Sequence, residues 1–154
     1  MSPLPMGTGG SGLTGRSNGG GSGTTRVPVP GPEPDPVVLD MGDGDLRLAE
    51  ARRLAARACA GLHPDVSDDV ALCVSELVTN AHRHGRAPVQ LRITRSPTSL
   101  HVAVDDHDTQ HPQLRAAHDG GGRGLAIVAA ISTRWGTEAH AWGKTVWADI
   151  PITS

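Results

Sequence analysis

The most regular pattern in the sequence lies between Pro64 and Gly85, and it predicts a long amphipathic helix. Pro64, Asp65 and Ser67 are residue types that favour a helix start, and a glycine follows the last apolar residue. Between these ends, apolar residues recur at the three- and four-residue spacing of an α-helix, at Val70, Cys73, Val74, Leu77, Val78 and Ala81. Such a helix needs a second apolar layer to cover its buried face.

Alternating apolar and polar residues supply that second layer. In chain order we expect a strand at 37–40, helices at 45–61 and 64–85, strands at 88–95 and 100–106, a polar loop at 107–119, a helix from 125 to about 133, and strands at 135–141 and 144–150. Most of these strands are hairpin neighbours. The predicted fold class is therefore a two-layer α/β sandwich of the α+β type, with a mixed, mostly antiparallel sheet and helices packed on one face.

The first 36 residues differ in composition from the rest of the chain. They hold ten of the 20 glycines and seven of the 12 prolines. Such a segment buries too little apolar surface to offset its ordering entropy, so we predict a disordered tail at 1–36 and a single domain at 37–154. A GxGxxG match at Gly7, Gly9 and Gly12 falls in this tail, without the strand and helix of a dinucleotide site, and we attribute it to chance.

Composition excludes several classes of partner. The formal net charge of −2 offers no basic field for a phosphate backbone, so we expect no direct nucleic-acid binding. No apolar run approaches the roughly 18 residues that cross a bilayer, and the N-terminus lacks the order of a signal peptide. Cys59 and Cys73 lie in helical patterns without CxxC spacing, which indicates buried thiols in a reducing compartment. We therefore expect a cytoplasmic protein without membrane contact.

Three polar residues fall on one side of the long predicted helix. Glu76, Asn80 and His84 are spaced four residues apart, so they form a stripe at the border of its apolar face. A carboxylate, an amide and an imidazole along one border are candidates for a binding site. For the stripe taken alone, a solvated helix edge with Glu76 and Asn80 as a plain surface pair is the more common explanation.

A glycine-rich segment runs directly into the third predicted helix. Residues 120–124 contain four glycines and Arg123. Backbone N–H groups of such a loop can converge at the positive end of a helix dipole, where a phosphate binds; a flexible hinge or a crowded turn is the alternative. The GKT at Gly143–Thr145 is not a P-loop, because the residue five positions before Gly143 is Glu138 rather than glycine.

Asp106 ends the second strand of the first hairpin. A carboxylate at this place can accept a hydrogen bond from an exocyclic amine such as that of adenine. In isolation, an aspartate at the end of a strand is more often a turn former. His107 and His111 follow in the polar loop, but they lack a clear third ligand, so we expect no metal ion between them.

Taken together and in this order, these segments resemble a known family. SELVTNAHRHG carries an ExxxNAxxH pattern, and it precedes the strand-end Asp106, a GRGL segment at 122–125 and a closing GKTVW strand. This combination resembles the nucleotide-binding domain, with the Bergerat-type ATP-binding fold, that gyrase, a heat-shock chaperone, histidine kinases and the MutL repair protein share. The short form with GGRGLAIVAAISTRWG and GKTVWADIP is similar to the anti-sigma-factor serine kinases. The resemblance covers about residues 37–152.

The resemblance implies a role for each matched residue. Asn80 corresponds to the Mg²⁺ ligand, Glu76 to the general base that activates a serine hydroxyl of a partner, and Asp106 to the adenine-binding aspartate. Gly122 and Gly124 correspond to the phosphate loop, and we expect Leu125 and Thr145 among the nucleotide contacts as well. From its position in this loop, we infer that Arg123 adds a charge-assisted contact to a phosphate oxygen. His84 closes the motif, and we expect it to be structural.

The implied activity is that of an ATP-binding regulatory protein with Mg²⁺ as cofactor. It would be a serine/threonine protein kinase that phosphorylates a serine of an anti-anti-sigma partner of the STAS type and controls a sigma factor in transcription. The family also implies dimerisation. Two alternatives remain open: a protein-binding module with weak or absent catalysis, and an ATPase domain detached from a sensor kinase.

The segment after Asp106 departs from the family pattern. The family's adenine loop reads DxGxG, whereas this chain has Asp108 and Gln110 at the two glycine positions. The loss of these glycines removes two sites where the backbone could pass close to the base.

Overall fold

The computed structural model describes residues 34–42, 46–110 and 123–153, which belong to one compact unit. Its elements are β1 (Val37–Gly42), α1 (Leu48–Ala58), α2 (Pro64–His84), β2 (Val89–Arg95), β3 (Ser99–Asp106), α3 (Arg123–Ile131), β4 (Arg134–His140) and β5 (Gly143–Pro151). All of these elements were predicted, with ends that differ by a few residues. The predicted tail, apart from its last three residues, lies outside the described residues.

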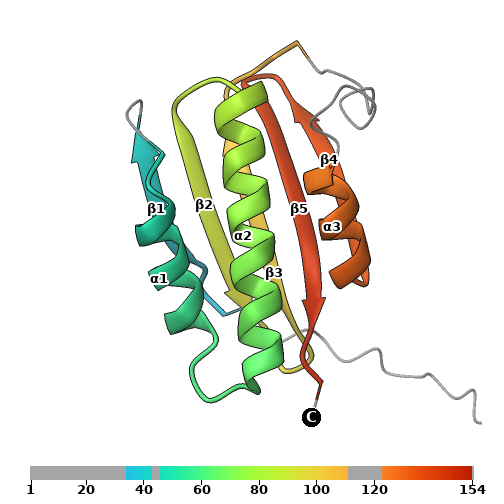
Figure 1. The fold of residues 1–154 in the computed structure, drawn as a ribbon. Helices are drawn as coiled ribbons and strands as arrows, with labels where there is room; N and C mark the ends of the chain where they lie inside the picture. Colours follow the sequence, from blue (N-terminus) through green and yellow to red (C-terminus); the bar gives the residue numbers. More distant parts are fainter. Residues whose placement is uncertain (1–33, 43–45, 111–122, 154) are drawn as a thin grey trace, which may run out of the picture. The chain divides into compact units, whose positions relative to one another are not determined.

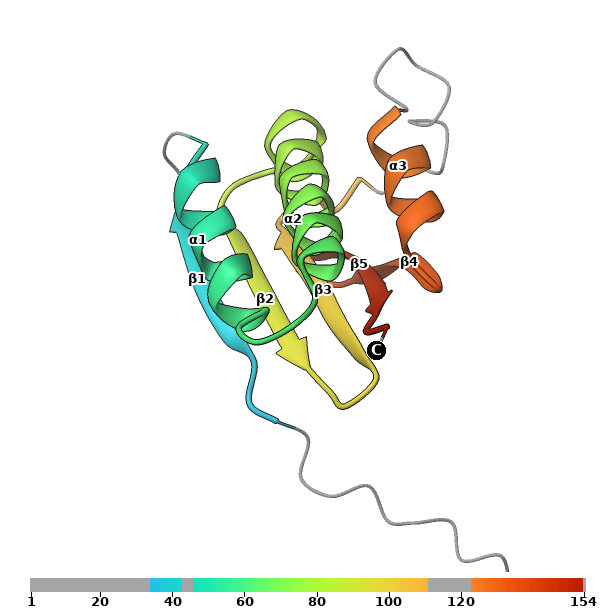
Figure 2. The same ribbon diagram turned by 60° about the horizontal axis from the view of Figure 1, so that its bottom comes forward.

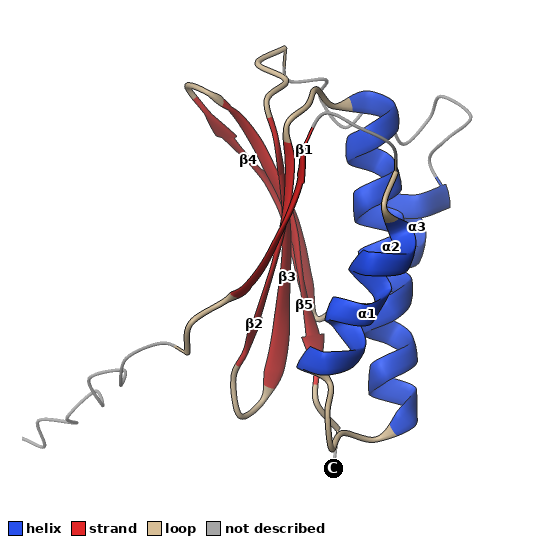
Figure 3. Cartoon of the chain, turned by 90° about the vertical axis from the view of Figure 1, so that its left-hand side faces the viewer, coloured by secondary structure: helices blue, strands red, loops and turns tan. Residues whose placement is uncertain are grey.

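The five strands form one sheet in the order β1-β2-β3-β5-β4. All four pairings between the described strands are antiparallel, so the sheet is not mixed as predicted. The three described helices lie together on one face of the sheet, as Figure 3 shows. The predicted two-layer α+β fold with helices on one face is confirmed.

The order of the strands follows from the connections. β2 and β3 form one hairpin, and β4 and β5 form a second one that joins the sheet through β5 (Figure 1). In the second view, α1 lies over β1 and β2, and α3 lies near β4 (Figure 2). The helix α2 contacts both β3 and β5, so it covers the line where the two hairpins meet.

The ends of α2 are set by local chemistry. Pro64 is the first residue of the helix, where a backbone N–H is not needed for helical hydrogen bonding. The ring of His63, which precedes it, accepts a hydrogen bond from the Asp65 N–H at 3.2 Å. At the other end, the Gly85 N–H donates to the Ala81 carbonyl at 2.8 Å. The apolar positions predicted from the spacing are all buried: Val70, Cys73, Val74, Leu77, Val78 and Ala81.

The core is aliphatic because the chain contains no Phe and no Tyr. Its largest fully buried apolar side chains are Leu77, Leu91, Ile93, Leu100 and Ile150. Cys59 and Cys73 are free and buried, as predicted, and burial raises the pKa of the Cys73 thiol to about 12. Among the described helices, none is both long enough and apolar enough to cross a membrane.

We expect Leu77→Ala to lower the free energy of unfolding by about 2–5 kcal/mol, because it leaves a cavity between α2 and the sheet. Leu72→Ala is the matched control, since Leu72 lies on the same helix with 40% of its surface exposed and should lose less than about 1 kcal/mol. Urea denaturation followed by circular dichroism measures both. Equal losses would contradict the burial of the predicted face.

Candidate functional site

Asp106 is fully buried although its side chain is an acidic group, and it lies where β3 ends. Its Oδ1 accepts a hydrogen bond from the backbone N–H of Asp108 at 2.8 Å, which makes a turn after the strand. Its Oδ2 has no hydrogen-bond partner among the described residues. Because a buried carboxylate oxygen without a donor is costly, this oxygen is a place where the N–H of a ligand would fit.

Two glycines approach Asp106, one at the end of α2 and one at the start of β5. A Cβ on Gly85 would lie 2.5 Å from Asp106 Cγ, and a Cβ on Gly143 would lie 2.0 Å from the Asp106 backbone oxygen. Neither position accepts a side chain without a shift of its neighbours. The glycine of the GKT segment therefore serves close packing at the start of a strand, in agreement with the prediction that GKT is not a P-loop.

Lys144 is a candidate that the sequence analysis missed. It pairs directly with Asp106 in the β3–β5 ladder, and only 5% of its side chain is exposed. Its Nζ lies 3.2 Å from Asp106 Oδ2 and 3.7 Å from Asp108 Oδ2. These are ion-pair distances, but Nζ has no partner in hydrogen-bond geometry among the described residues. The alternation of the strand, with Val146, Ala148 and Ile150 toward the core, is the signal that could have identified it.

The structure does not bring Thr145 together with the other residues predicted for nucleotide binding. It follows Lys144 in β5, so its side chain lies on the opposite face of the sheet. There its hydroxyl donates to Asp105 Oδ1 at 2.6 Å and lies 2.9 Å from His140 Nε2. Asp105 in turn accepts two hydrogen bonds from Arg92. These contacts occupy the Thr145 hydroxyl with a structural network.

The phosphate end of the predicted site is built from α2 and α3. A Cβ on Gly124 would lie 2.7 Å from Glu76 Oε2, so the Glu76 carboxylate contacts the first turn of α3. Asn80 lies one helical turn further along α2 and, like Glu76, is partly exposed. Nine residues, or about 13 Å along the helix axis, separate Glu76 from Gly85 beside Asp106. The structure therefore brings Glu76 and Gly124 together near the middle of α2, whereas Asp106 lies at the C-terminal end of the helix.

The remaining predicted residues are placed less completely. Arg123 is the first residue of α3, and Leu125 is partly buried and packs against the core. Gly122 lies outside the described residues, as does His111. His84 is exposed in the last turn of α2.

The oxygen atoms present fit a magnesium ion that is held jointly with a nucleotide. Asn80 offers an amide oxygen, and Mg²⁺ is commonly bound by one or two protein oxygens together with phosphates. Within 34–42, 46–110 and 123–153, no group of three or more His, Cys, Asp or Glu residues is arranged to hold a metal ion by itself. A bound nucleotide would have to supply the missing ligands.

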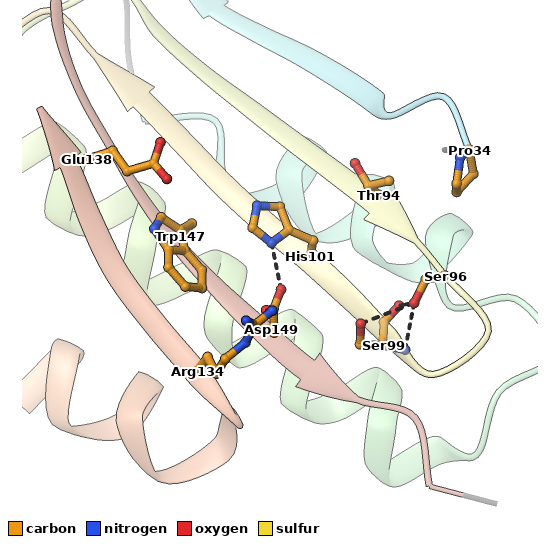
Figure 4. A pocket seen from close by; sticks show the side chains of 9 residues that line it. All are labelled: Pro34, Thr94, Ser96, Ser99, His101, Arg134, Glu138, Trp147 and Asp149. Carbon is orange, nitrogen blue, oxygen red and sulfur yellow. Dashed lines mark hydrogen bonds and ion pairs between the residues drawn. The ribbon is translucent and has the colours of Figure 1, made fainter. Parts of the chain in front are cut away.

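A separate hollow of about 440 Å³ lies on the face of the sheet that the helices do not cover (Figure 4). Its centre is Asp149, which accepts hydrogen bonds from His101 Nδ1 at 2.6 Å and from Arg134 at 2.8 Å. Trp147 stacks on the His101 ring with 5.6 Å between the ring centroids. None of the residues predicted for nucleotide binding lines this hollow: Pro34, Thr94, Ser96, Ser99, His101, Arg134, Glu138, Trp147 and Asp149.

Comparison with known proteins identifies the class to which this fold and site belong. The model of the histidine kinase-like ATPase domain family matches residues 44–150, more than half of the chain. The chain therefore belongs to the histidine kinase-like ATPase domain family, whose members bind ATP. Comparison with curated proteins finds no match.

Two solved structures from Erythrobacter litoralis are similar to the chain. The histidine kinase domain of the EL346 blue-light activated histidine kinase is 24% identical over 68% of this chain and 60% of that chain, with a TM-score of 0.49. A second structure of that kinase is 23% identical over 68% of this chain and 40% of that chain, with a TM-score of 0.52. At these identities the likeness concerns the fold, and the chain spans less than two thirds of either structure.

We expect Gly85→Ala to lower the free energy of unfolding by about 1–3 kcal/mol, because its Cβ would overlap Asp106 and the Ala81 carbonyl. Gly124→Ala is the control, since its Cβ would meet only the mobile end of Glu76, and its effect should stay within about 1 kcal/mol. Urea denaturation measures both variants. A loss for Gly124→Ala as large as that for Gly85→Ala would argue against the tight packing around Asp106.

Proposed function

We propose that this domain binds ATP with Mg²⁺ along α2 and transfers the γ-phosphoryl group to a serine hydroxyl of a partner protein. The observation that carries the proposal is the Asp106 carboxylate, which is fully buried. Its Oδ2 forms an ion pair with Lys144 at 3.2 Å but has no partner in hydrogen-bond geometry among the described residues. An exocyclic amine of a base supplies a hydrogen-bond donor. The family to which the chain belongs makes ATP the nucleotide of choice.

The part of α2 between Glu76 and its C-terminal end has a length that suits a nucleotide bound along it. With the base at Asp106, the phosphates would extend toward Glu76 and the start of α3, about 13 Å away along the helix. Asn80 lies between these two ends, where its amide oxygen would hold the magnesium ion. When bound, the ion offsets the negative charge of the phosphates. The first turn of α3, with Arg123 and the Gly124 N–H, lies at the positive end of a helix dipole and favours a phosphate.

Glu76 is the group that would accept a proton in this reaction. Its Oε2 would take the proton from the serine hydroxyl while the serine oxygen bonds to the γ-phosphorus. The bond between that phosphorus and the bridging oxygen of the β-phosphate then breaks and leaves ADP. The carboxylate is partly exposed beside α3, so a serine of a second protein can reach it.

The partner that fits this activity is an anti-anti-sigma protein of the STAS type, with a sigma factor as the protein it controls. Support comes from the resemblance of the whole 37–152 segment to short anti-sigma-factor serine kinases. Phosphorylation of the partner serine would decide which protein the domain retains. A homodimer is part of the same proposal.

A protein-binding module with weak catalysis is the second candidate, and the sequence after Asp106 favours it. Asp108 and Gln110 stand at the two glycine positions of the family's adenine loop, and Lys144 pairs with both carboxylates there. In this second candidate, the ion pair occupies Asp106 in place of a base. In such a module, capture of a partner would not depend on nucleotide.

We expect the full chain to bind ATP with Mg²⁺ in isothermal titration calorimetry, and Asn80→Ala to weaken that binding at least about tenfold because the amide ligand is lost. With EDTA in place of Mg²⁺, the wild type and Asn80→Ala should bind ATP equally weakly. Absence of heat with the wild type at millimolar ATP would refute the nucleotide site.

We expect Glu76→Gln to retain ATP affinity and to lose phosphoryl transfer by about 10²–10⁴-fold, because the amide cannot accept the proton. The assay follows ³²P from ATP to purified STAS-domain candidates. Glu138→Gln is the matched control, because Glu138 is exposed on the opposite face of the sheet and its variant should transfer normally. Equal transfer by Glu76→Gln and the wild type would exclude Glu76 as the base, and an acid-labile product would indicate a histidine acceptor.

A further inference from the structure

We propose that Lys144 determines base specificity in this site. Its Nζ donates a hydrogen bond to the ring nitrogen N1 of adenine, beside the C6 amine, which donates a hydrogen bond to Asp106 Oδ2. This inference rests on the proposed nucleotide binding and assigns a role to Lys144 of the closing GKTVW strand, a residue to which the resemblance gave none. It makes the recognised ligand an adenine nucleotide and gives the chain two adjacent contacts to the base.

The placement of Lys144 carries the first step. Lys144 and Asp106 are directly paired across β3 and β5, with side chains that are 5% and 0% exposed and 3.2 Å between Nζ and Oδ2. Neither Nζ nor Oδ2 has a partner in hydrogen-bond geometry among the described residues. The fold therefore presents one buried donor and one buried acceptor side by side, both with unused hydrogen-bonding capacity.

The chemistry of the base carries the second step. Adenine presents an amine donor on C6 and, on the neighbouring ring position, the acceptor N1. The acceptor Asp106 Oδ2 and the donor Lys144 Nζ match this edge of adenine. A base that satisfies only one of these two buried atoms binds less favourably than adenine, which satisfies both. Guanine presents two adjacent N–H donors, which a free carboxylate binds with both oxygens. Here Oδ1 already accepts the Asp108 N–H, so only one Asp106 oxygen is available and a single amine is favoured.

Asp108 positions the lysine for this contact. Its Oδ2 lies 3.7 Å from Lys144 Nζ, so the ammonium group is held between two carboxylates. An ammonium group has three N–H donors. Two of them can be directed at Asp106 and Asp108, and the third remains for the base. Asp108, which stands at the family's first glycine position, would therefore orient Lys144 toward the base.

The test compares ATP with its 1-deaza analogue, in which a carbon replaces N1 and the amine is retained. We expect the full-length wild type to bind ATP about tenfold more tightly than 1-deaza-ATP, because a hydrogen bond from a charged donor is lost. Lys144→Met should bind both nucleotides equally, with the affinity of the wild type for 1-deaza-ATP. Thr145→Val, the next residue of the same strand on the opposite face, is the control and should keep the tenfold preference.

The outcomes separate this inference from the proposed function. Wild type that binds neither nucleotide refutes the proposed function. Wild type that binds ATP and 1-deaza-ATP equally refutes the role of Lys144 while nucleotide binding stands, and this comparison requires no variant if Lys144→Met fails to fold. Tighter ATP binding by Lys144→Met would also overturn the inference, because Lys144 would then compete with the base for Asp106.

Discussion

The close approach of three backbone segments around Asp106 is the constraint on which the rest of the site depends. The end of α2, the end of β3 and the start of β5 meet there, and glycines at 85 and 143 are what allow them to do so. Because no side chain fits between these segments, the position of α2 along the sheet is fixed. Asn80 and Glu76 therefore stand at defined distances from the buried carboxylate, which is the condition for binding one rigid ligand at several points.

The alternation of side chains divides the sheet into two chemically different faces. At the end of β3, Asp106 faces the helices, whereas its neighbour Asp105 faces the uncovered side and binds Arg92 and Thr145. On the uncovered face, Asp105 has hydrogen-bond partners in Arg92 and Thr145. On the helix side, Asp106 Oδ2 has only the ion pair with Lys144, without hydrogen-bond geometry, among the described residues. This difference is why the nucleotide is proposed to bind on the helix side.

The chain belongs to the histidine kinase-like ATPase family, but the loop after Asp106 departs from the family pattern. The family fold supplies a carboxylate at the strand end and a long helix with an amide and a second carboxylate along it. At the first of the two missing loop glycines the chain has Asp108, whose carboxylate pairs with the buried Lys144 of β5. The charge introduced at the loop is balanced from β5, so the departure from the motif extends beyond the loop itself.

The sequence by itself determined the elements, the fold class and the stripe of Glu76 and Asn80, because helical and strand periodicity are local properties of the chain. It also gave the carboxylate of Asp106 at a strand end. Only the tertiary structure decided that the sheet is antiparallel throughout and that Lys144 lies beside Asp106. These facts depend on the register between β3 and β5, which are separated by a helix and another strand. The register between strands so far apart in the sequence is set when the two layers pack, so the sequence pattern of either strand alone does not predict which residues pair.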